Sequence, residues 1–184
     1  IMNAMKPSGH DATAFTLVLV GLAALASAMG IGRFAFTPLL PLMQAHAGLS
    51  LSQGAWLASA NYIGYLVGAL AYTFMSPVPR NAIRMGLVAT ALFTLAMSIT
   101  TGNGAWLACR FAAGVASAFV LVGVSAWALP MLSELGRAAW SGWIFSGIGI
   151  GIGAAGMAGL VAGLGDYEPA RAWLLLGAMS APER

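Results

Sequence analysis

The sequence predicts an all-α protein, a polytopic bundle of transmembrane helices, and three observations support this fold class. Hydrophobic residues make up 60% of the 184 residues and charged residues only 7%, whereas a soluble domain carries about 25% charged residues. Apolar runs long enough to cross a bilayer recur along the chain. The short alternating segments of about ten residues that build an outer-membrane barrel are absent from the sequence.

Six apolar segments follow one another, separated by polar or turn-rich stretches. The sixth offers only about ten apolar residues, half of the 20 that a spanning helix needs. The chain also begins with Ile1 rather than methionine. We therefore expect about five and a half helices from a longer protein or a truncated reading frame. The expected helices cover residues 15–43, 54–74, 85–101, 105–129 and 138–164, with the sixth beginning at 172.

The basic residues between the segments predict the orientation. Lys6, Arg80, Arg84 and Arg137 fall on one side of the predicted membrane, and Arg171 falls on the other. Because cytoplasmic loops carry an excess of Lys and Arg, the N-terminus is expected in the cytoplasm and the protein in a bacterial inner membrane. The basic residues form no cluster, so no nucleic-acid partner is expected.

Two other features of the chain are less informative. Ala26-Ser27-Ala28 resembles the cleavage site of a signal peptide, but the apolar run continues to Met43, beyond a signal core of about 7–15 residues. Cys109 is the only cysteine, so a disulfide within the chain is impossible. No cofactor or metal ion is expected.

Arg33 is the first candidate functional residue. It lies about 15 Å from the outer end of the first helix, which would be about 42 Å long, so its guanidinium is expected within a hydrocarbon core of about 30 Å. A charge there costs at least about 2.5–3.5 kcal/mol. Pro38 removes a backbone donor and interrupts the helix. Arg33 therefore either faces a solute or ion, or fixes the kink by binding carbonyls freed at Pro38.

Arg110 is the second charge within a span, about 9 Å below the outer end of the fourth helix. From that depth it either snorkels to the interface or shares a cavity with Arg33. The acidic residues lie in loops or tails, so the spans offer no carboxylate to pair with either arginine. The two arginines thus predict an anionic ligand, or a carboxylate from another part of the protein. The acids are Asp11, Glu134, Asp166, Glu168 and Glu183.

Polar and small residues complete the candidate set. Asn61 and Tyr65 are four residues apart and share a helix face, where they either orient a solute or hydrogen-bond between helices. Glycines spaced by about four residues let helix backbones approach closely. These predict packing faces on the second and fifth helices at Gly64, Gly68, Gly147, Gly151 and Gly156.

The order of these features resembles the N-terminal half of a major facilitator superfamily transporter. The run from Leu107 through Arg110 and Gly114 is similar to the fourth-helix motif of that superfamily. The glycine run is similar to its fifth-helix antiporter motif, although Ile152 replaces a proline there. GRFAFTPLLPLM and LSQGAWLASANYIGYLVGAL resemble a bacterial subgroup of uncharacterised transporters. In the loop after the second helix, Tyr72 replaces the usual acidic residue, which leaves the family's gating salt bridge in doubt.

The resemblance implies twelve helices in two pseudo-symmetric halves, with helices one, two, four and five around a central cavity. The expected function is secondary transport of a small organic solute, anionic and proton-coupled, by alternating access. The expected partners are the lipid bilayer, that solute and the missing C-terminal half. A truncated fragment without activity is one alternative. An intramembrane serine protease is the other, but it needs a basic partner for its serine, and His10 and His46 lie outside the spans.

Overall fold

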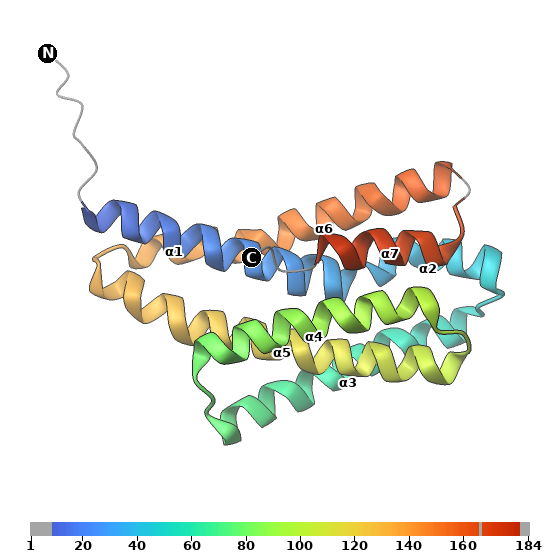
Figure 1. The fold of residues 1–184 in the computed structure, drawn as a ribbon, viewed down its shortest axis with the longest axis horizontal. Coiled ribbons are helices and arrows are strands. Elements are labelled where there is room, and N and C mark those ends of the chain that lie inside the picture. Colours follow the sequence, from blue (N-terminus) through green and yellow to red (C-terminus); the bar gives the residue numbers. More distant parts are fainter. Residues whose placement is uncertain (1–8, 166, 181–184) are drawn as a thin grey trace, which may run out of the picture.

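The computed structural model describes residues 9–165 and 167–180 and shows an all-α bundle (Figure 1). Within this part of the chain every regular element is helical. By length and composition, four helical stretches are able to cross a membrane: His10–Ala47, Pro79–Ile99, Asn103–Glu134 and Ala138–Leu164. These findings confirm the predicted fold class. The elements of these stretches, and the two helices beside them, follow in chain order.

The first transmembrane stretch is divided into three parts. It consists of α1 (Gly9–Leu25), a π-helix η1 (Ala26–Arg33) and α2 (Phe36–Ala47). The backbone N–H of Ala35 donates to Ile31, 3.0 Å away, where the path changes from η1 to α2. Pro38 follows in the first turn of α2, where a backbone N–H needs no partner within the helix. The interruption therefore lies directly after Arg33.

The second helix is α3 (Leu51–Met75). Ser50 caps it: its hydroxyl accepts from the Gln53 backbone N–H at 3.1 Å, while the Gln53 side chain accepts from the Ser50 N–H at 2.9 Å. This reciprocal pair is a capping box. The helix contains 25 residues, a length of about 38 Å at 1.5 Å per residue. It is long enough to cross a membrane, but it is not among the four stretches that are also apolar enough.

The remaining helices are α4 (Pro79–Ile99), α5 (Asn103–Glu134), α6 (Ser141–Leu164), preceded by the 3₁₀ turn η2 (Ala138–Trp140), and α7 (Pro169–Met179). Our prediction that the fourth helix ends near Leu129 is wrong. Pro130 lies inside α5, and the helix ends where Gly136 adopts a positive φ of 68°. Pro130 lacks a backbone N–H to donate within the helix, but α5 continues for four residues beyond it, to Glu134.

The helix α5 lies between α3 and α4, and α6 runs along α1 and η1 (Figure 1). The side of α6 that faces the first stretch consists of small and branched residues. An added Cβ at Gly147 would strike the Leu22 carbonyl, and one at Gly151 would strike the Ala26 carbonyl. Glycine at these two positions permits backbone contact between the helices.

Basic residues gather at one end of the bundle. Arg80 and Arg84, at the start of α4, line the same cavity as Thr16 near the start of α1. Arg137 binds Asp11, also near the start of α1, with Nη2 2.6 Å from Oδ1. Arg171 belongs to α7 and lines a separate pocket with Ser98 and Ile99, at the end of α4. Arg80, Arg84 and Arg137 thus lie apart from Arg171 in the described part of the chain, while Lys6 lies outside the described residues.

Candidate functional site

Arg33 ends the π-helical segment and turns its guanidinium toward aromatic rings. Its guanidinium carbon lies 4.0 Å from the ring centroid of Tyr65, 5.0 Å from that of Tyr62 and 5.4 Å from that of Phe34. A cation within about 6 Å of a ring centroid is attracted to the face of that ring. The aromatic side chains therefore hold the charge where the membrane offers little water.

The Arg33 side chain remains half-buried, so part of it is open to its surroundings. Its Nε is buried and has no hydrogen-bond partner among the described residues. No ion pair recorded in this part of the chain involves Arg33. Aromatic faces stabilise a cation without using its hydrogen-bond donors. Arg33 also has a side-chain hydrogen-bond interaction with Tyr65, so a further acceptor would share the guanidinium with the Tyr65 hydroxyl.

Arg110 has different surroundings, in which its guanidinium contacts the backbone beside Arg33. The side chain is 3% exposed. Nη2 donates to the Arg33 carbonyl at 2.8 Å and Nη1 to the Gly32 carbonyl at 3.3 Å. The helical interruption frees carbonyl groups there, and a buried guanidinium with several donors satisfies them. Arg110 therefore holds the backbone that carries Arg33.

Asn61 also bonds between helices. It is 2% exposed, and its Nδ2 donates to the backbone carbonyl of Arg110 at 2.8 Å. The two helices approach closely on either side of this bond, since an added Cβ at Gly64 would strike the Phe111 carbonyl and one at Gly114 would strike the Asn61 carbonyl. Asn61 thus ties α3 to α5, and its side chain does not face a solute.

These residues form a continuous chain of contacts in the structure. Asn61 of α3 binds the backbone of Arg110, the Arg110 side chain binds the backbone of Arg33, and the Arg33 side chain lies over Tyr65 of α3. Three helices therefore fix the position of one guanidinium. Pre-organised groups of this kind are what a binding site requires.

Tyr62 was not among the candidate residues, although it contacts Arg33. It is 55% exposed and precedes Tyr65 by three residues, so both rings lie on one face of α3. This spacing is visible in the sequence. Only the approach of Arg33, which depends on the packing of the first helix against α3, shows that the two rings act together.

The glycines of α6 face two directions. Gly147 and Gly151 pack against the first transmembrane stretch, whereas an added Cβ at Gly156 would meet nothing within 4 Å. The packing expected for Gly156 is therefore absent among the described residues. Gly159, which sequence reasoning did not select, packs against Pro38 with 2.7 Å between its added Cβ and the Pro38 Cβ. Gly68 packs against Val115 of α5.

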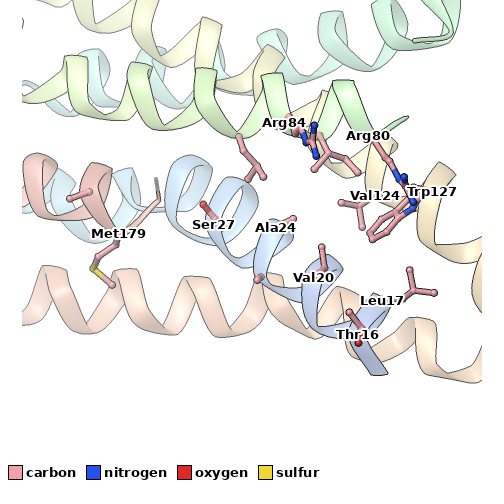
Figure 2. Close-up of a pocket in the computed structure, with 14 residues that line it drawn as sticks. Thr16, Leu17, Val20, Ala24, Ser27, Arg80, Arg84, Val124, Trp127 and Met179 are labelled. Carbon is pink, nitrogen blue, oxygen red and sulfur yellow. The ribbon is translucent and has the colours of Figure 1, made fainter. Parts of the chain in front are cut away.

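A cavity of about 910 Å³ lies apart from Arg33, among α1, α4, α5 and the end of α7 (Figure 2). We expected a cavity among the first, second, fourth and fifth helices. The described residues that line this one come instead from the first, third, fourth and sixth helices, and Arg33 and Arg110 are not among them. Figure 2 shows Arg80, Arg84 and Trp127 together near one end and Met179 near the other.

Comparisons with known proteins agree with the helical architecture. Residues 25–182 match the model of a family described as uncharacterised MFS-type transporter YbfB. A similar protein is the uncharacterised MFS-type transporter YceJ of Bacillus subtilis (strain 168), which is 31% identical over 141 residues. That alignment covers 73% of this chain and 34% of YceJ. The chain thus spans about a third of the length of this curated relative.

Proposed function

The chain belongs to the family of the uncharacterised MFS-type transporter YbfB, and from this membership we propose that it forms one half of a secondary transporter for a small organic anion. The family relation and the apolar helices make it a multi-pass membrane protein of a transport family. This relation points to transport and away from catalysis. The anionic substrate, the coupling and the second half belong to the proposal.

One observation supports the anionic substrate: a half-buried guanidinium held in place by aromatic rings and by a backbone that Arg110 binds. An arginine within a membrane protein is costly unless it serves a pathway or a partner. Arg110 satisfies the nearby carbonyls, so Arg33 is not needed to stabilise the helical interruption. A carboxylate is a suitable ligand because the planar guanidinium binds it with two parallel hydrogen bonds.

Transport in this proposal proceeds by rocking this half against a second half around Arg33. Sites between repeated halves are common in membrane transporters. The open side of α6 supports such a neighbour, since a Cβ added to any of five glycines there would meet nothing within 4 Å: Gly142, Gly149, Gly153, Gly156 and Gly163. Their spacing places them on one helix face, where a second half would find room for close backbone contact.

The open glycine face of α6 also supports a second proposal, in which the chain by itself transports no solute. Without a neighbour, α6 exposes Trp143, Met157 and Leu160 beside these glycines. The side of a transport cavity that a second half would supply is then missing. In this reading the chain binds an anion weakly at Arg33 but transports nothing until a second half joins it.

We place the protein in a bacterial inner membrane with its N-terminus in the cytoplasm, because the end of the bundle with Arg80, Arg84 and Arg137 fits the inner side. Proton coupling is proposed from the family resemblance alone. In the described part of the chain the spanning stretches carry carboxylates only at their ends, Asp11 in the first turn of α1 and Glu134 as the last residue of α5. The proton carrier is therefore expected on the second half.

Transport in proteoliposomes tests the proposal. The chain is reconstituted alone and together with the remaining part of a related transporter, and exchange of labelled small carboxylates is measured against neutral amides of the same shape. We expect exchange of carboxylates in the combined preparation, loss of exchange in Arg33→Gln and partial activity in Arg33→Lys. Unchanged exchange in Arg33→Gln would remove Arg33 from the mechanism.

A further inference from the structure

We propose that the groove among α1, α4, α5 and the end of α7 binds an anionic phospholipid. Its phosphate would lie at Arg80 and Arg84, and an acyl chain would follow the apolar wall toward Met179. The groove has a volume of about 910 Å³ and lies away from Arg33 (Figure 2). It is therefore distinct from the proposed transport site.

The mouth of the groove is positively charged. Arg80 and Arg84 are both exposed and four residues apart, so they share one face of α4. The residues that line the groove in the described part of the chain include no acid. Trp127 lies beside Arg80 (Figure 2), where its ring forms part of the groove wall while its indole nitrogen is buried. The mouth thus offers donors for a phosphate.

The wall of the groove is apolar. Leu17 and Val20 of α1 face Ile83 and Leu87 of α4 across it, with Val124 of α5 also lining it. At the far end, the Ser27 hydroxyl already donates to the Ser180 carbonyl at 2.6 Å. The groove therefore changes along its length from charged to apolar.

That order of charge and apolarity matches the order within a lipid molecule. Arg80 and Arg84 lie at the basic end of the bundle, where lipid phosphates are found when that end meets the membrane surface. Basic pockets between transmembrane helices bind acidic headgroups, while the apolar wall gains from covering an acyl chain. A protein helix in the same groove would have to supply an acid at its end to match the two arginines.

Native mass spectrometry of the purified chain tests this site. The chain is released from nanodiscs that contain equal amounts of phosphatidylglycerol and phosphatidylcholine, and bound lipid is identified by its mass. We expect retained phosphatidylglycerol, with binding about thirtyfold weaker in the double variant Arg80→Gln and Arg84→Gln. Arg171→Gln, at the other end of the bundle, is the matched control for loss of charge and should bind normally.

A second variant separates the groove from its mouth. Ala23 is exposed and lines the groove, so Ala23→Phe should fill the space and displace the lipid while both arginines remain. Equal retention of both lipids, or full retention in the double arginine variant, would overturn the proposal. The proposal would also be overturned if protein occupied the groove and excluded lipid, either a second copy of the chain or residues that follow Met179.

Discussion

At the scale of single residues, two arginines with similar sequence surroundings have different contacts in the structure. The sequence shows that Arg33 and Arg110 both lie within spans and that the spans offer no carboxylate. It does not show which guanidinium meets backbone carbonyls, because that depends on how the first helix is interrupted beside α5. The structure pairs Arg110 with the carbonyls of Gly32 and Arg33 and leaves Arg33 half-buried.

Arg110→Gln is expected to destabilise the chain whether or not an anion is present. The shorter side chain cannot reach both carbonyls, and each buried acceptor left unpaired costs about 1–3 kcal/mol. Thermal unfolding in detergent, followed by circular dichroism, measures the change. Arg33→Gln is the control and should unfold close to the native chain. Equal stability of the two variants would show that Arg110 does not hold the interruption.

Asn61→Ala should have a smaller effect. The variant removes one interhelical hydrogen bond, from Asn61 Nδ2 to the Arg110 carbonyl, and such bonds average about 0.6 kcal/mol within membranes. The expected loss of stability is therefore about 1 kcal/mol or less. If Asn61 instead served only to contact solute, stability would not change and anion binding alone would fall.

At the scale of elements, the sequence predicts the presence of helices well and their interruption less well. Apolar runs mark the spans, but the end of a helix depends on local hydrogen bonds. The run from 15 to 43 belongs to three consecutive elements, α1, η1 and α2. Pro130 looks like a stop signal, yet α5 continues through it to Glu134. Gly30 and Gly32 lie in the π-helix η1 and are poor helix formers, but glycines in a span also mark close helix packing, so they do not identify a π-helix from the sequence.

The two faces of α6 give an element-scale prediction. Gly151→Val should lower stability by about 1–3 kcal/mol, the usual effect of overpacking, because an added Cβ there strikes the backbone of the first stretch. Gly149→Val is the matched control, since nothing lies within 4 Å of its added Cβ. The same unfolding measurement compares them. A large loss of stability in Gly149→Val would mean that Gly149, and not only Gly151, packs against another helix.

The interface with a second half gives another prediction at this scale. Gly153 faces open space in this chain, so Gly153→Leu should leave the isolated chain stable. It should nevertheless block association with the remaining part of the transporter, because a large side chain prevents close approach of helix backbones. Co-purification of the two parts measures this. Normal association in Gly153→Leu would place the second half elsewhere.

At the scale of the whole molecule, the sequence predicts an all-α bundle with apolar helices, and the structure has four helical stretches that are long and apolar enough to cross a membrane. The location of cavities does not follow from the sequence. The groove of about 910 Å³ lies among helices that we did not expect to surround a cavity. Its walls come from segments far apart in the chain, and only the packing of α4 and α7 against each other and against η1 shows that they meet.

The orientation is tested by labelling single cysteines. In a Cys109→Ala background, Ser76→Cys reports the loop before α4 and Thr101→Cys the loop before α5. An impermeant maleimide added to intact cells should label Thr101→Cys alone, and inside-out vesicles should show the reverse. Labelling of Ser76→Cys in intact cells would place the N-terminus outside.

In the proposed mechanism Arg33 receives the anion, and Arg110 only holds the backbone of Arg33 in place. The most direct test is the anion-dependent rise in unfolding temperature of the chain in nanodiscs, measured with a panel of small carboxylates and their neutral amides. At a hundred times the dissociation constant, binding stabilises the folded state by about 2.7 kcal/mol. We expect a higher unfolding temperature with at least one carboxylate and no change with its amide, and we expect Arg33→Gln to lose that rise. An equal rise in Arg33→Gln, or no rise with any carboxylate, would contradict this mechanism.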